Sequence, residues 1–164
     1  MNGRGFLDKG DRVKKRGGDK TILLIDQNDH DVELFEDAAE RSCKACVMHL
    51  ASGKEAIDYL IRQQSNGSPL PHLIIIEWDL PSADAFSVLR FVNGNPELKP
   101  IPTIILTGVY SQEHIESARE LGAESVFLKP TDIDEMEKLV YALCEVYIHF
   151  ALPPAPVRDE AALA

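Results

Sequence analysis

Five short apolar runs alternate with five segments of helical periodicity along most of this 164-residue chain. The runs are almost entirely apolar, which indicates strands buried on both faces of a sheet. We predict strands over residues 21–26, 44–51, 72–78, 102–108 and 124–129, and helices over residues 29–42, 52–61, 85–92, 111–121 and 131–150. Because strands and helices alternate, the sequence predicts an α/β fold with a doubly wound, five-stranded parallel sheet.

We expect one domain, residues 21–150, between two tails. Residues 1–20 are basic and glycine-rich without an apolar period, so we predict a disordered N-terminal tail. Residues 151–164 form a proline-rich C-terminal tail. The net charge of −10 argues against nucleic acid as the main partner. No apolar run approaches the about 20 residues that a membrane span needs, so we expect no transmembrane helix and no membrane partner.

The chain has three cysteines, Cys43, Cys46 and Cys144, and no secretory leader, which predicts a reducing, cytoplasmic setting. The CKAC motif at 43–46 admits a redox or metal site. Redox motifs of this type normally lie where a strand gives way to a helix, and this one lies where a helix gives way to a strand. In a strand, Cys46 and His49 also point to opposite faces. We therefore favour small buried thiols without chemistry.

Four of the five predicted strands end in residues that carry chemistry. Doubly wound sheets form their sites outside the carboxyl ends of the strands, so these side chains should share one crevice. Each residue is a weak signal alone, and the combination is a strong one. The residues are Asp26 and Gln27 after the first strand, Glu77 after the third, Thr107 after the fourth, and Lys129 with Pro130 after the fifth.

These motifs resemble the receiver domain of two-component response regulators, over residues 21–150. The resemblance rests on ILLID at 22–26, LIIIEWDLP at 73–81, IILTG at 104–108 and LGAESVFLKP at 121–130. The stretch NPELKPIPTIILT is most similar to small single-domain regulators that work with phytochrome kinases. The resemblance implies a CheY-like, flavodoxin-like (βα)5 fold, a cis Lys129–Pro130 peptide and a non-enzymatic role in phosphorelay signal transduction.

Family chemistry implies a role for each position. An aspartate on the third strand takes a phosphoryl group from a kinase histidine, two acidic residues and a backbone carbonyl hold Mg²⁺, and a hydroxyl and a lysine bind the phosphoryl oxygens. In this sequence Glu77 stands at the phosphoacceptor position, Asp26, Gln27, Glu77 and Asp79 at the metal site, and Thr107, Lys129 and Val126 at the phosphoryl-binding and switch positions.

The sequence departs from the family pattern at four positions. Glu77 replaces the acceptor aspartate, Gln27 the second acidic residue, Val126 an aromatic switch residue and Ala85 a glycine. One added methylene displaces a carboxylate by roughly 1.5 Å, and about 1 Å of misplacement can slow a reaction by ~10²-fold. Gln27 also removes a charge from a site whose octahedral geometry is strict. We expect Mg²⁺ binding to be weak or lost.

We hypothesise that Glu77 pairs with Lys129 and imitates part of the phosphorylated state, so that the receiver acts independently of phosphorylation. Two alternatives stay open: a receiver that is phosphorylated at this atypical site, and a structural or dimerisation adapter. Enzyme classes fit less well. A haloacid-type phosphatase needs an aspartate where Glu77 stands, and a nucleotide or flavin binder needs a glycine-rich first turn, which QNDHD lacks.

The expected partners are proteins: a sensor histidine kinase or a downstream signalling protein. In the receiver family, the face made by the fourth helix, fifth strand and fifth helix often docks partners, so we also predict a homodimer through this face. The residues concerned are Ile115, Val126, Phe127, Tyr141 and Tyr147.

Overall fold

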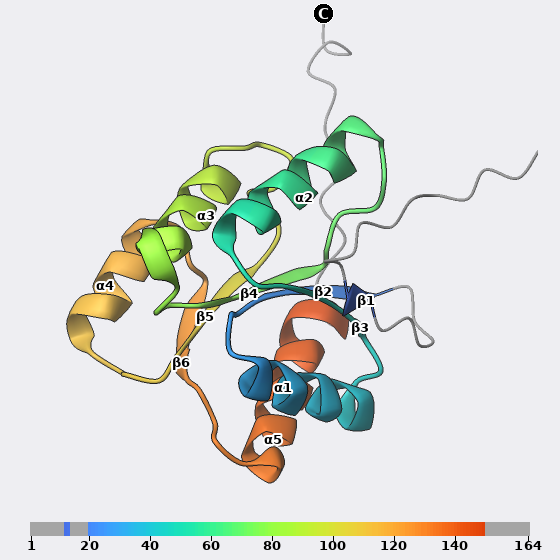
Figure 1. The fold of residues 1–164 in the computed structure, drawn as a ribbon, viewed down its shortest axis with the longest axis vertical. Helices are drawn as coiled ribbons and strands as arrows, with labels where there is room; N and C mark the ends of the chain where they lie inside the picture. The colour runs from blue at the N-terminus through green and yellow to red at the C-terminus, as the bar shows by residue number, and fades with distance from the viewer. Residues whose placement is uncertain (1–11, 14–19, 150–164) are drawn as a thin grey trace, which may run out of the picture.

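The computed structural model describes residues 12–13 and 20–149, and its centre is a twisted sheet between two layers of helices (Figure 1). Five strands are parallel, in the order β3-β2-β4-β5-β6, which confirms the predicted doubly wound sheet. Their bounds are β2 Thr21–Ile25, β3 Cys46–Leu50, β4 Leu73–Glu77, β5 Thr103–Thr107 and β6 Ser125–Leu128.

A sixth strand, β1 (Arg12–Val13), pairs antiparallel with β3 at the edge of the sheet. The prediction of disorder over residues 1–20 is therefore wrong for Arg12 and Val13. An edge strand such as β3 has free backbone N–H and C=O groups, and an extended segment can pair with them without any apolar pattern of its own. The remaining tail predictions, for residues 1–11, 14–19 and 151–164, lie outside the described residues.

The helices cover both faces of the sheet. α1 (Asp29–Ser42) and α5 (Ile133–Cys144), which continues as the π-helical turn η2 (Glu145–His149), lie on one face, while α2 (Gly53–Ser65), α3 (Asp84–Asn93) and α4 (Gln112–Glu120) lie on the other (Figure 1). Two separate apolar clusters result, because successive strand side chains point to opposite faces. None of the helices within the described ranges is long and apolar enough to cross a membrane.

Local chemistry sets where most helices begin. The side chains of Asn28, Ser52, Ser111 and Asp132 each accept a hydrogen bond from a backbone N–H in the first turn of α1, α2, α4 and α5. Asp132 is the N-cap of α5, one residue after the predicted cap at residue 131. Gly122, which follows α4, has a φ of 100°, a conformation that glycine adopts without a steric penalty.

The Lys129–Pro130 peptide is trans, so the expectation of a cis bond is wrong. An X–Pro amide favours trans by only about 0.5–1 kcal/mol, so the surrounding loop decides between the isomers. Here the N–H of Lys129 donates to the Thr107 carbonyl over 2.8 Å, which extends the pairing of β5 and β6 to the residue before the proline.

Candidate functional site: a lysine held by three carboxylates

The site lies at the carboxyl edge of the parallel sheet. β2 and β4 are neighbours, and β6 is separated from β4 by β5, so the residues at their ends converge on one crevice. Residues from the loops after β2, β4, β5 and β6 and from the first turn of α1 line this crevice. They are Asp26, Gln27, Asn28, Asp31, Glu77, Asp79, Gly108, Lys129, Pro130 and Thr131.

The Lys129 ammonium occupies the centre of the site. Its Nζ donates to Asp26 Oδ2 over 2.8 Å and to Asp31 Oδ2 over 3.0 Å, and it forms an ion pair with Glu77 Oε2. The Lys129 side chain is 9% exposed. Burial alone would lower the pKa of Lys129, but the hydrogen bonds and charges of Asp26 and Glu77 outweigh it and raise this pKa above its usual range. The lysine is therefore a fixed cation.

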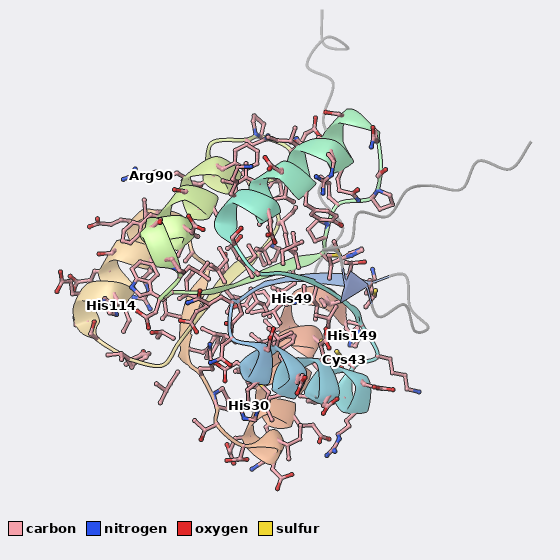
Figure 2. The ribbon with its side chains drawn as sticks, in the orientation of Figure 1. His30, Cys43, His49, Arg90, His114 and His149 are labelled. Carbon is pink, nitrogen blue, oxygen red and sulfur yellow. The ribbon has the colours of Figure 1, made fainter. Side chains whose placement is uncertain are left out.

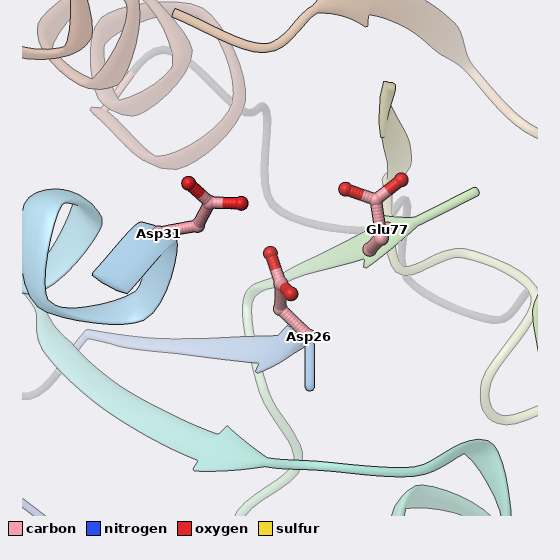
Figure 3. Close-up of side chains that lie close together, drawn as sticks. All are labelled: Asp26, Asp31 and Glu77. Carbon is pink, nitrogen blue, oxygen red and sulfur yellow. The ribbon is translucent and has the colours of Figure 1, made fainter. Parts of the chain in front are cut away.

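The three carboxylates converge from the end of β2, the first turn of α1 and the end of β4 (Figure 3). One oxygen from each of Asp26, Asp31 and Glu77 lies within 4.8 Å of the others. The second oxygen of two of them is also used: Asp26 Oδ1 accepts from the Asn28 N–H and Glu77 Oε1 from the Asp79 N–H, both over 2.9 Å. Asp26 and Glu77 are thus held rigidly by both oxygens.

Asp31 is a site residue that sequence reasoning missed. It lies in the first turn of α1, two positions after the helix starts, and its side chain is 26% exposed. The available signal was an acidic residue in the first helical turn beside the strand end that carries Asp26. Asp31 supplies a carboxylate to the cluster, whereas Gln27, at the position where the family has its second acid, is exposed at the rim.

Thr107 is not among the residues that line the crevice, although the adjacent Gly108 is. The Thr107 side chain is completely buried, and its hydroxyl donates to the Val109 carbonyl over 2.9 Å and accepts from the Val109 N–H over 3.2 Å. The predicted convergence is confirmed for Asp26, Glu77 and Lys129. The Thr107 hydroxyl bonds within its own loop, and its role in phosphoryl binding stays a prediction.

The other predicted positions lie around the cluster. Asp79 is exposed, and its backbone N–H fixes Glu77. Val126 is half-buried against the apolar cluster under α2, α3 and α4. Ala85, where the family has a glycine, is buried inside α3, and the left-handed residue of this connection is Ser82, with a φ of 60°.

The donor set suits a divalent cation, because hard cations such as Mg²⁺ and Mn²⁺ bind carboxylate oxygens. Asp26, Asp31 and Glu77 would hold such an ion, which would supply positive charge to the phosphoryl oxygens. Lys129 already contacts all three carboxylates. A metal ion therefore competes with the ammonium for the same oxygens.

Comparison with known proteins places this geometry in context. Residues 22–141 match the family model of the response regulator receiver domain. The chain is 28% identical to the probable methanogenesis regulatory protein FilR2 of Methanothrix harundinacea, over 92% of this chain and 97% of FilR2. It is 27% identical to the response regulator Rcp1 of Synechocystis, over 83% of this chain and 94% of Rcp1.

Among solved structures, the chain is similar to the phosphorylated cyanobacterial phytochrome response regulator RcpA, with 27% identity and a TM-score of 0.73 over 83% of this chain and 99% of RcpA. The parallel sheet, its five helices and the acidic crevice at the strand ends agree with the family match. This chain belongs to the response regulator receiver domain family, the CheY-like signalling module of two-component systems.

Proposed function

We propose that this receiver domain transmits signals through protein–protein contacts in a conformation that an internal ion cluster sets, without phosphorylation. The observation that carries the proposal is the Lys129 ammonium, which bonds to Asp26 and Asp31 and pairs with Glu77 in a nearly buried site. A phosphoryl group arriving at Glu77 would have to displace Lys129 from this network.

The longer side chain of Glu77 supports the same proposal. Its Oε2 reaches Lys129 while its Oε1 is held by the Asp79 N–H, so the carboxylate that would have to attack is engaged at both oxygens. A carboxylate carries about one negative charge and a phosphoryl group nearer two. The Glu77–Lys129 pair therefore imitates the phosphorylated state only in part, and we propose that a partner protein selects the active conformation.

The experiment is incubation with acetyl phosphate and Mg²⁺, followed by intact-mass spectrometry of the wild type and of Glu77→Asp. We expect no acyl phosphate on the wild type. Labelling of Glu77→Asp alone would show that side-chain length blocks the chemistry. The matched control is Glu113→Asp, at an exposed site on α4, which should behave as the wild type does.

A receiver that is phosphorylated at the atypical site is the second candidate. Two structures favour it, since the similar RcpA was determined in a phosphorylated form and the similar Rcp1 with bound Mn²⁺. Stable labelling of wild-type Glu77 in the same experiment would establish this candidate and reject independence from phosphate. If neither the wild type nor Glu77→Asp is labelled, Gln27 and the rest of the pocket prevent phosphorylation.

We further propose that the partners are a sensor histidine kinase or a downstream protein, in the cytoplasm, and that the face of α4, β6 and α5 forms the contact or a homodimer. Leu128 on β6 and Tyr141 on α5, which are both more than half exposed, support this face as a docking surface. Of the five residues predicted for it, Ile115 is buried, and Val126, Phe127 and Tyr147 pack against the apolar clusters. A mass by light scattering that stays monomeric at all concentrations would reject the homodimer.

A further inference from the structure

Two cysteines meet where α1 and α5 end, away from the charged crevice. Cys43 is the C-cap of α1, and Cys144 is the last residue of α5. α1 begins at the crevice and rises about 1.5 Å per residue, so its 14 residues place Cys43 about 20 Å from the ion cluster. The proposed signalling function uses neither cysteine.

The two thiols are in contact. A side-chain hydrogen bond joins Cys43 and Cys144. Cys144 is completely buried in the apolar cluster under α1 and α5, and Cys43 packs against the same cluster while remaining half-buried. One thiol of the pair is thus partly accessible, and the other is enclosed in the apolar cluster.

The surroundings make the two thiols chemically different. The hydrogen bond from Cys144, helped by the Ala45 backbone, Ser42 and the charge of His149, lowers the pKa of Cys43 although burial opposes it. The same hydrogen bond, together with burial, raises the pKa of Cys144. The thiolate is the reactive form of cysteine, and Cys43 is the half-buried member of the pair, which a small oxidant can reach. Figure 2 shows Cys43 with His149, which lies on the turn after α5.

We propose that Cys43 and Cys144 are a peroxide-sensitive thiol pair that forms a reversible disulfide between α1 and α5. The Cys43 thiolate attacks one oxygen of the peroxide, the O–O bond breaks, and protonation of the leaving oxygen gives water or an alcohol with a sulfenic acid on Cys43. The Cys144 sulfur then attacks the Cys43 sulfur, the S–O bond breaks, and the oxygen leaves as water with the Cys144 proton. Two thiols are oxidised to one disulfide, and one peroxide is reduced.

This pairing differs from the one that the CKAC motif suggests. Cys46 lies in β3, paired with Thr21 in the ladder, and the hydrogen bond of Cys43 goes to Cys144 across the helix interface. The pair could not be predicted from the sequence, because Cys43 and Cys144 lie far apart along the chain and meet only when α1 packs on α5. The prediction of thiols without chemistry is, on this proposal, replaced for Cys43 and Cys144 and kept for Cys46.

The test treats the full chain with hydrogen peroxide and then blocks free thiols with an alkylating agent. Peptide mapping without reduction locates any disulfide. We expect a Cys43–Cys144 crosslink in the wild type and in Cys46→Ser, reversal by dithiothreitol, and loss of the crosslink in Cys43→Ser. Cys144→Ala should accumulate sulfenic acid on Cys43, which dimedone traps, because the second thiol is missing.

A second measurement tests the hydrogen bond between the two thiols. The rate of alkylation of Cys43 in the wild type should rise with pH at a midpoint below that of an ordinary cysteine thiol, and in Cys144→Ala this midpoint should move up because the hydrogen bond is lost. A crosslink between Cys43 and Cys46, or an unmodified Cys43 after peroxide treatment, would overturn the proposal. So would an alkylation midpoint that is the same with and without Cys144.

Discussion

The ion cluster around Lys129 can be tested by replacing the lysine with methionine, which keeps an unbranched side chain of similar length and removes the charge. In the wild type, Lys129 neutralises part of the charge of Asp26, Asp31 and Glu77 in a site where its side chain is 9% exposed. In Lys129→Met, three carboxylate oxygens stay within 4.8 Å of one another without a cation. The folded state then has to hold three like charges in one pocket.

The magnitude follows from the spacing. At an effective dielectric constant of 20, two unit charges separated by 4.8 Å repel by about 3.5 kcal/mol, and the three carboxylates make three such pairs. Keeping one carboxyl protonated at pH 7 costs about 4 kcal/mol, which is less than the repulsion of the two pairs that this proton removes. The variant should therefore take up a proton in the pocket, and we expect a loss of about 3–5 kcal/mol of stability, typical of a broken buried ion pair.

Urea unfolding at pH 7 measures this loss, with the fluorescence of the single tryptophan, Trp78, as the probe; its side chain is 8% exposed, so unfolding should change its environment. The difference between variant and wild type should shrink as the pH is lowered towards 4, because protons neutralise the carboxylates. Millimolar Mg²⁺ or Ca²⁺ should stabilise the variant more than the wild type, since the ion no longer competes with the ammonium.

The control is Lys138→Met, since Lys138 forms an exposed ion pair with Glu135 on α5. Exposed pairs contribute little, so this variant should unfold close to the wild type at every pH. The reasoning is refuted if Lys129→Met loses no more stability than Lys138→Met. A large loss that does not depend on pH would also refute it, because loss of packing, not of charge, would then be its cause.

Three further predictions concern stability. The pKa of Lys129 is raised in the folded state, so the stability that the cluster contributes should be complete below about pH 10.5, the pKa of an unfolded lysine, and should be lost as the pH rises further. Alkaline unfolding should show this loss in the wild type and not in Lys129→Met. Burial, with a smaller effect from Lys20, lowers the pKa of His72, whose Nδ1 accepts a hydrogen bond from the Thr21 N–H. The stability of the wild type should therefore fall as the pH drops below about 6.5. In His72→Asn, the stability measured by urea titration should depend less on pH over this range. A Cβ at Gly53 would lie 2.7 Å from the Cβ of Asp84, so Gly53→Ala should lower the stability by about 1–3 kcal/mol, and a melting temperature equal to that of the wild type would contradict the close packing of α2 and α3.

The apolar pattern of the strands and the residues at the strand ends were enough to predict most of the fold. The apolar runs mark strands buried on both faces, and parallel strands must be joined by crossovers that place their carboxyl ends at one edge. For this reason the convergence of Asp26, Glu77 and Lys129 could be predicted from the sequence alone. The family resemblance could be read from the same residues, since the motifs that carry it are the strand ends themselves.

The tertiary structure alone decided how the side chains pair. Asp31 joins the cluster because the first turn of α1 faces Lys129, and the hydroxyl of Thr107 bonds to Val109 within its own loop. The Cys43 thiol meets Cys144 only through the packing of α1 on α5. Strand positions follow from a periodic pattern that each segment carries within itself. The partner of a buried hydrogen-bonding group depends on which segments pack together in space, and local sequence does not encode that choice.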